Sequence, residues 1–209
     1  MFITFEGPEG SGKSLQARLL ADRLRAASQT VVETREPGGT ALGDQLRHLL
    51  LVRRDLEIVA RAEALLMCAA RAQHVEQVIR PALARSEVVV CDRFGDSTLA
   101  YQGYGRGLGL DDLRAVLSFA TAGLEPDMTI LLDLPVEAGL ARKQVQSRLN
   151  PAWTRFEAET LAFHERIRTG YLALAAADPH RWQCVDALRP PADIADEVWA
   201  RVASRMGLG

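Results

Sequence analysis

Short apolar runs alternate with longer stretches of helical periodicity along this chain. Continuous apolar and β-branched residues predict strands at residues 2–6, 30–34, 88–91, 129–133 and 182–185. Apolar residues recur at helical spacing in residues 13–27, 55–84, 112–122, 154–177 and 192–206, with further helices before residue 52 and from residue 136. Alternating strands and helices predict an α/β fold, with a five-stranded parallel sheet, right-handed crossovers and helices on both faces.

Two features interrupt this pattern. Pro81 stands inside the long segment 55–84 and is expected to bend or end that helix. Residues 143–153 read KQVQSRLNPAW, with mixed charges, polar side chains and an Asn-Pro step, which predicts a mobile loop between two helices. The length of 209 residues suits a single domain, residues 1–209.

Composition and net charge argue against several classes of binding partner. Lys and Arg number 25 against 27 Asp and Glu, a formal net charge of −2, so no general basic field exists to hold a nucleic acid. The three cysteines and four histidines show no ligand-like or disulfide-like spacing, which favours structural free thiols. The N-terminus enters a strand at once and no apolar run could span a bilayer, so we expect a cytoplasmic protein without a membrane partner.

A glycine-rich stretch, GPEGSGKS, directly follows the first strand and fits the pattern G-x-x-x-x-G-K-[S/T]. A strand before it and a helix after it are the context in which backbone N–H groups and a helix N-terminus cradle phosphates. Lys13 would bridge the terminal phosphates and Ser14 would offer a hydroxyl to Mg²⁺. The expected ATP-binding residues are Gly7, Pro8, Glu9, Gly10, Ser11, Gly12, Lys13 and Ser14. A GTPase is disfavoured, because the single asparagine precedes a proline and no Asn-Lys-x-Asp segment exists.

Two further stretches, TREPGGT and CDRFGDSTLAYQG, each begin at the carboxyl end of a predicted strand, where open α/β sheets bind ligands. Asp92 could reach a metal ion directly or through water. Arg93 and Arg35 offer planar forks suited to phosphate. Each pair taken alone, Asp92-Arg93 or Arg35-Glu36, could be a local surface ion pair, but together they favour an acceptor site.

In this order and spacing, GPEGSGKS, REPGGT and DRFGDSTLAYQG resemble thymidylate kinase, and the likeness continues through AARAQHVEQVIRPAL and RFEAETLAFHERIRTGYLALA over essentially the whole chain. The resemblance implies a P-loop nucleoside monophosphate kinase fold. It implies transfer of the γ-phosphate of ATP to dTMP, with Mg²⁺, in dTTP synthesis, and a homodimer.

The resemblance also implies roles for individual residues. Arg93 would hold the dTMP 5′-phosphate with Arg35 close by, and Arg71 would reach the thymine O4 edge. Tyr101 would lie under the deoxyribose, and Glu9 near its 3′-hydroxyl. The full expected dTMP set is Glu9, Arg35, Pro37, Met67, Arg71, Arg93, Ser97, Thr98, Tyr101 and Gln102. Tyr101 could instead be a core aromatic, and Arg71 could lie on a solvated helix face.

This chain departs from many relatives at three points. Met67 stands where a Phe often stacks on thymine, and its thioether can cover a ring face with less fixed geometry. Gly10 stands where some relatives carry a catalytic Arg. Thr154 replaces an Asp before Arg155, which leaves the resting position of Arg155 open.

The cationic residues Arg142, Lys143, Arg148 and Arg155 instead surround the aperiodic segment. The resemblance implies that they belong to a mobile lid at about residues 142–155, with Arg142 near ATP, although any of them could be a solvated helix end. The expected catalytic residues are Lys13, Asp92, Arg93, Arg148 and Arg155.

Phosphoryl transfer to a phosphate needs no general base, because a phosphate monoester with a second pKa of about 6 is already mostly a dianion at neutral pH. Two alternatives stay open. One is a P-loop kinase for another deoxynucleotide or for a nucleoside. The other is a nucleotide-dependent regulatory ATPase that binds no small acceptor.

Overall fold

A five-stranded, all-parallel sheet forms the centre of the molecule, in the order β2-β3-β1-β4-β5. The computed structural model describes residues 1–53, 55–149, 156 and 159–208. The strands are β1 (Phe2–Glu6), β2 (Val31–Arg35), β3 (Val88–Asp92), β4 (Met128–Asp133) and β5 (Trp182–Asp186). The predicted parallel sheet is therefore confirmed, and each strand lies within two residues of its predicted bounds.

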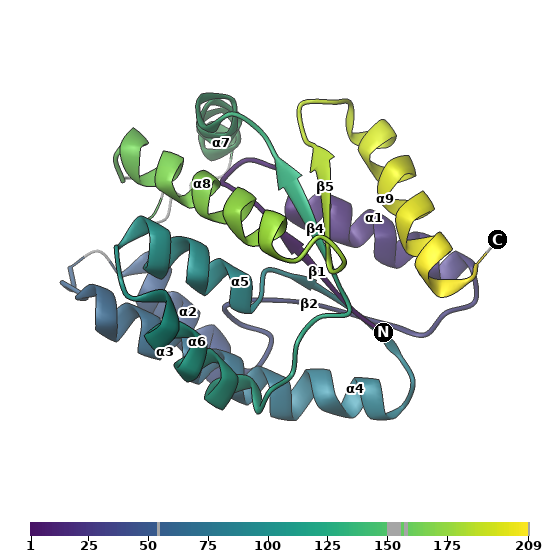
Figure 1. Cartoon of the computed structure of the whole chain (residues 1–209), viewed down its shortest axis with the longest axis horizontal. Coiled ribbons are helices and arrows are strands. Elements are labelled where there is room, and N and C mark those ends of the chain that lie inside the picture. The colour runs from purple at the N-terminus through teal and green to yellow at the C-terminus, as the bar shows by residue number, and fades with distance from the viewer. Residues whose placement is uncertain (54, 150–155, 157–158, 209) are drawn as a thin grey trace.

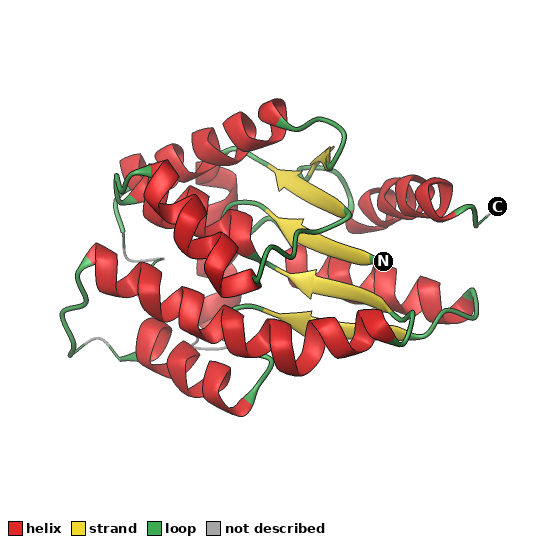
Figure 2. Ribbon diagram, turned by 60° about the horizontal axis from the view of Figure 1, so that its bottom comes forward, coloured by secondary structure: helices red, strands yellow, loops and turns green. Residues whose placement is uncertain are grey.

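Helices cover both faces of the sheet, as predicted (Figures 1 and 2). The α-helices are α1 (Lys13–Ala26), α2 (Ala41–Arg47), α3 (Ala60–His74), α4 (Arg80–Ala84), α5 (Gly95–Thr98), α6 (Leu110–Thr121), α7 (Val136–Leu149), α8 (Leu161–Ala177) and α9 (Pro191–Met206). Three π-helical segments, His48–Val52, Val75–Ile79 and Leu99–Gly105, continue α2, α3 and α5. Among the described residues, no helix is long and apolar enough to cross a membrane.

The alternation of side chains along β1 explains the two layers. Ile3 and Phe5 point to one face, where they pack in a core with residues of α1 and α9. Phe2 points to the other face and packs with Val75 and Ile79 of the long helical segment. Glu6 has the same parity as Phe2, so its carboxylate enters the layer that contains α5 and α8.

Two predicted helix starts were wrong. The helix expected from residue 55 begins at Ala60, and Leu56 and Val59 before it are exposed. The helix expected from residue 154 begins at Leu161, where the Thr160 hydroxyl caps it by accepting from the Phe163 N–H. Of the two outcomes expected at Pro81, a bend or an end, the helix does not end there, because a π-helical turn precedes Pro81 and places it in the first turn of α4, where a missing N–H is tolerated.

The carboxyl ends of the strands meet at one edge and position the loops that follow them. β1 leads into the glycine loop, β2 into Glu36, β3 into Arg93 and β4 into α7. Backbone bonds tie these ends together, since the Arg93 N–H donates to the Phe5 carbonyl and the Glu36 N–H to the Asp92 carbonyl, both at 2.9 Å. This edge is where the sequence predicts a ligand.

Candidate functional site

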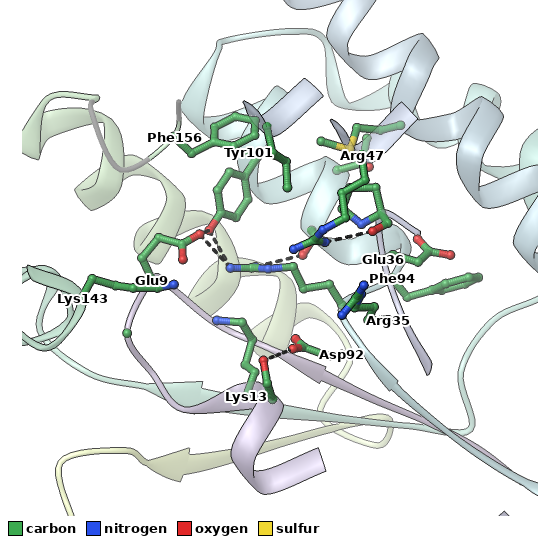
Figure 3. Close-up of a pocket in the computed structure, with 18 of the residues that line it drawn as sticks. Glu9, Lys13, Arg35, Glu36, Arg47, Asp92, Phe94, Tyr101, Lys143 and Phe156 are labelled. Carbon is green, nitrogen blue, oxygen red and sulfur yellow. Dashed lines mark hydrogen bonds and ion pairs between the residues drawn. The ribbon is translucent and has the colours of Figure 1, made fainter. Parts of the chain in front are cut away.

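A cavity of about 450 Å³ opens at this edge of the sheet (Figure 3). It brings together most of the predicted residues, namely Glu9, Gly10, Gly12, Lys13, Ser14, Arg35, Pro37, Met67, Arg71, Asp92, Arg93, Ser97, Thr98, Tyr101, Gln102, Arg142 and Lys143. The cavity lining does not include Gly7, Pro8 and Ser11, but each of them accepts a hydrogen bond from the Lys13 Nζ. The wall also includes residues for which the sequence predicted no role, namely Leu15, Glu36, Arg47, Leu51, Phe94 and Phe156.

The glycine loop wraps around the amino group of Lys13. Gly10 and Gly12 adopt φ values of 73° and 88°, which side chains disfavour, and Gly12 leads directly into α1. The Lys13 Nζ donates to the carbonyls of Gly7 and Pro8 at 3.0 and 2.7 Å. Burial first, and then the like charge of Arg93, lower the pKa of Lys13 from 10.5 to about 7. The loop therefore places the amino group of Lys13 at the N-terminus of α1, whose backbone N–H groups also favour phosphate.

Ser14 and Asp92 meet at the floor of the cavity, where the Ser14 hydroxyl donates to Asp92 Oδ2. The other carboxylate oxygen, Oδ1, is buried without a hydrogen-bond partner among the described atoms. No cluster of three His, Cys, Asp or Glu side chains occurs in the described parts of the chain. This donor set fits Mg²⁺, which keeps several waters and is held by one or two protein oxygens plus substrate phosphates.

Arg93 lines the cavity and has a backbone φ of +71°, which is unusual for a residue with a side chain. Its Nη2 donates to Glu9 Oε1 and to the Tyr101 hydroxyl, both at 2.9 Å. Its guanidinium also lies 5.0 Å from the centre of the Tyr101 ring. The ion pair is thus with Glu9, 84 residues away, rather than the local pair with Asp92 that the sequence left open.

Glu9 is held ionised by these neighbours. Burial alone would raise its pKa, but Arg93, Lys13 and the Tyr101 hydroxyl together lower it to about 2. Figure 3 shows Lys143 extending toward Glu9 at one end of the cavity, while Arg35 and Arg47 lie at the other. Arg47 was not predicted, and burial followed by the nearby charge of Arg35 lowers its pKa. Arg47 belongs to none of the motifs described above, so its place in the cavity wall becomes clear only from the folded structure.

A buried charge cluster fixes Arg71. Its Nε donates to Glu36 Oε2 at 2.7 Å, and its Nη1 donates to the Thr98 hydroxyl at 3.0 Å. The other carboxylate oxygen, Glu36 Oε1, accepts a hydrogen bond from His74 Nδ1 at 2.9 Å. Arg71 is 3% exposed, which excludes the solvated helix face as an alternative. Glu36 lies within REPGGT, so the motif could have signalled a role for this carboxylate as well.

Tyr101 and Phe156 form an aromatic corner at the far end of the cavity. Their ring centres are 5.4 Å apart and nearly perpendicular, at 83°. Met67 lines the same cavity, and the Gln102 amide donates to the buried Glu63 carboxylate at 2.8 Å. Tyr101 is therefore both a core aromatic and a cavity residue, because its ring packs inward while its hydroxyl reaches Glu9.

Of the four cationic residues predicted for the lid, the structure describes the side chains of Arg142 and Lys143 only. Arg142 on α7 lines the cavity and donates from Nη1 to the Ala187 carbonyl, at 2.8 Å, in the loop after β5. The side chain of Arg148 and the whole of Arg155 lie outside the described part of the chain. Their roles therefore stay predictions.

The segment after β3 contains helical turns for which the sequence pattern predicted no element. Within CDRFGDSTLAYQG and just beyond it, α5 and the π-helical segment Leu99–Gly105 form. Its small and polar residues show no amphipathic period. Burial against α8 supplies the stability that local propensity does not, and most of the π-helical segment is buried.

Comparison with known proteins gives one consistent family. The family described as thymidylate kinase matches residues 5–198. A thymidylate kinase of Thermomicrobium roseum is 54% identical over 208 residues, covering 100% of this chain and 97% of the relative. Another, of Desulfovibrio desulfuricans, is 55% identical over 197 residues, covering 93% and 91%. The crystal structure of thymidylate kinase from Ehrlichia chaffeensis superposes with a TM-score of 0.77 at 33% identity, covering 97% of each chain.

Proposed function

The chain belongs to the thymidylate kinase family of nucleoside monophosphate kinases, which transfer a phosphate from ATP to dTMP, and we propose how its own residues divide that task. The observation that carries the proposal is that two anion sites share one cavity. Arg93 Nη1 donates to the Gly7 carbonyl of the glycine loop at 3.2 Å, so the acceptor arginine abuts the donor loop.

The donor site is the glycine loop. Its backbone N–H groups and Lys13 bind the β- and γ-phosphates of ATP, and phosphate oxygens replace the carbonyls that Lys13 now contacts. Arg142, anchored at Ala187, lies on the nucleotide side. Ser14 and Asp92 would hold Mg²⁺, which would supply charge neutralisation on the phosphates when bound.

The acceptor site is the arginine cluster beside the loop. Arg93 holds the 5′-phosphate of dTMP, and Arg35 and Arg47 line the same cavity. The incoming phosphate competes with Glu9 for Arg93, and Glu9 then faces the sugar 3′-hydroxyl. Because the acceptor is already an anion, catalysis depends on aligning two phosphates among cations rather than on a general base.

The base site is the deep end of the cavity. Arg71, fixed by Glu36, reads the thymine edge, and Met67 covers a ring face. Thr98 and Gln102 complete the polar edge, with Pro37 and Ser97 nearby. Tyr101 lies under the deoxyribose and crowds a ribose 2′-hydroxyl, which gives a steric reason for deoxyribose preference. Arg148 and Arg155 stay sequence-based candidates for contacts to the transferring phosphoryl group.

We further propose that the enzyme acts in the cytoplasm as a homodimer that binds no nucleic acid. Large apolar side chains protrude from α3 and α6, which pack together, including Leu65 at 52% and Phe119 at 90% exposure. Such a surface suits burial against a second copy. Sedimentation equilibrium of the wild type and of Phe119→Asp would test it, with a shift toward monomer expected for the variant.

The activity is tested by ADP release from ATP and Mg²⁺ with dTMP, dUMP, dCMP, AMP and thymidine offered separately. We expect turnover to depend strongly on dTMP. Equal use of several monophosphates would overturn the base site, and turnover with thymidine would favour a nucleoside kinase. ADP release indifferent to every acceptor would favour a regulatory ATPase.

A further inference from the structure

A buried carboxylate lies behind Arg93 and takes no part in the roles proposed above. Glu6 ends β1 and is 0% exposed. Its Oε1 accepts the Phe94 N–H at 2.8 Å, and its Oε2 accepts the hydroxyls of Ser97 and Tyr171 at 2.6 and 2.9 Å. An isolated buried carboxylate is costly, so three donors converging on it from α5, α8 and the end of β3 indicate a built arrangement.

The same two hydroxyls accept hydrogen bonds from Arg93. Its Nη1 donates to the Ser97 hydroxyl oxygen at 3.2 Å and to the Tyr171 hydroxyl oxygen at 3.0 Å. A guanidinium can only donate, and each hydroxyl has a single hydrogen. A hydroxyl that gives its hydrogen to Glu6, or to the other hydroxyl 2.8 Å away, presents only lone pairs to Arg93. Glu6 therefore favours the orientation in which both hydroxyls accept from Arg93.

Glu6 also holds the backbone at the same point. The Phe94 N–H that it accepts directly follows Arg93, whose left-handed φ of +71° is disfavoured for a residue with a side chain. One carboxylate thus stabilises both the unusual backbone and the position of the guanidinium.

We propose that Glu6 is a positioning residue for the acceptor phosphate, acting through Ser97 and Tyr171 to hold Arg93 in its binding position. The inference rests on the proposed role of Arg93. It also reassigns Ser97, which serves Arg93 rather than dTMP directly, because its hydroxyl is already engaged by Glu6, Arg93 and Tyr171.

The charge state of Glu6 determines the conditions of the test. Burial and the nearby Asp96 raise the pKa of Glu6 to about 7. Arg93 and the hydrogen bonds from Ser97 and Phe94 lower this pKa, but they do not cancel the increase. Other titratable or charged groups whose pKa Glu6 influences are Lys13, Arg71, Cys91 and Tyr171. Binding is therefore measured at pH 8, where the carboxylate is ionised.

The decisive variant is Glu6→Gln, which keeps the size of the side chain. The amide nitrogen donates, so at least one hydroxyl must turn its hydrogen toward Arg93. We expect the affinity for dTMP, measured by calorimetry, to fall about tenfold or more, in line with loss of hydrogen bonds to a charged group. Affinity for thymidine, which lacks the phosphate, should change less than about twofold. Equal weakening of both ligands would overturn the proposal.

Glu63→Gln is the matched control, because Glu63 is an equally buried glutamate that bonds to Gln102 at the base end. Since dTMP and thymidine share the base, the ratio of their affinities should stay unchanged. A change in that ratio as large as that of Glu6→Gln would also overturn the proposal.

Tyr171→Phe removes one acceptor of Arg93 and serves if Glu6→Gln does not fold. We expect a smaller selective loss for dTMP, and little further loss when it is combined with Glu6→Gln. Arg93→Ala separates this inference from the proposed function. If Arg93→Ala lowers dTMP affinity selectively and the Glu6 and Tyr171 variants do not, the positioning role is wrong. If Arg93→Ala itself leaves the ratio unchanged, the acceptor site is misassigned and both proposals fall.

Discussion

Gly10 of the phosphate loop and Gly139 of α7 meet backbone to backbone. A Cβ on Gly10 would lie 2.0 Å from the Gly139 carbonyl oxygen, and a Cβ on Gly139 would lie 2.2 Å from the Glu9 carbonyl oxygen. Both distances are far shorter than any van der Waals contact. No side chain fits at Gly10 unless α7 moves, so an arginine at this position of the loop is incompatible with the observed packing of α7.

The contact couples the phosphate loop to the helix that carries Arg142 and Lys143. We predict that Gly139→Ala lowers kcat/KM for ATP about tenfold or more, because the methyl group pushes on the Glu9 carbonyl and distorts the loop. A glycine-to-alanine change inside a helix otherwise stabilises by roughly 0.5–1 kcal/mol. The measurements are steady-state kinetics and thermal unfolding.

Gly95→Ala is the control, since a Cβ there meets only Leu117, at 3.7 Å. It should retain near-normal kinetics. A Gly139→Ala protein that is both fully active and more stable than the wild type would show that the close contact relaxes without consequence.

Lys13 gives a prediction for both turnover and pH. Lys13→Met should lower kcat about a hundredfold or more by removing the charge that faces the transferring phosphate, while leaving the fold intact. Near-normal turnover would remove the assignment of the donor site. Circular dichroism verifies the fold.

The same variant should reveal the cost of burying this ammonium group. The folded pKa of Lys13 is about 7, against 10.5 for the ordinary side chain, so between these values the unfolded chain binds more protons. The free energy of unfolding of the wild type therefore falls as the pH drops from 10.5 to about 7. Below about pH 7 the loss reaches its full value, because both the folded and the unfolded chain then bind the proton. The free energy of unfolding of Lys13→Met minus that of the wild type should increase as pH falls from about 10 to 7. Urea denaturation at several pH values measures it, and a flat difference would contradict the buried charge.

Much of the fold was predictable because its strands are short apolar runs between helices of clear period. The long segment 55–84 failed at its start, since Leu56 and Val59 continue the apolar pattern but lie exposed before α3 begins at Ala60. The helical turns of residues 95–105 were missed for the opposite reason. Tertiary burial rather than local periodicity stabilises them.

Some residues of the candidate site could likewise be predicted from local motifs, and others could not. Motif residues such as Lys13, Arg93 and Asp92 were predicted, because phosphate chemistry constrains residue type and spacing locally. Glu6 was not predicted, because its role depends on Tyr171, 165 residues away. No local sequence pattern links Glu6 with Tyr171. They meet only because α8, which carries Tyr171, packs on the face of the sheet toward which the Glu6 side chain points.

Met67 tests the base end of the cavity. Met67→Phe should preserve or sharpen the preference for dTMP over dCMP and dUMP, because a planar ring stacks on thymine with more fixed geometry than a thioether. The ratio of kcat/KM values for the three nucleotides measures the preference. Met67→Leu, with similar volume and no sulfur, is the control and should leave that ratio within about twofold. Complete loss of activity in Met67→Phe would show that this side chain does not lie against the base.

Glu36 tests the buried charge cluster that fixes Arg71. Glu36→Gln leaves the guanidinium, which is 3% exposed, without its counterion, and breaking such a buried pair costs about 3–5 kcal/mol. We therefore expect a large fall in the free energy of unfolding together with a loss of preference for thymine, because Arg71 loses its fixed position. The control is Asp55→Asn, which breaks the ion pair between Asp55, 60% exposed, and Arg53, 47% exposed, so it should leave the free energy of unfolding almost unchanged. Urea unfolding and competition between dTMP and dCMP provide both readouts. If Glu36→Gln lost stability but kept full base preference, Glu36 would be a packing residue, and the base-reading role of Arg71 would not depend on it.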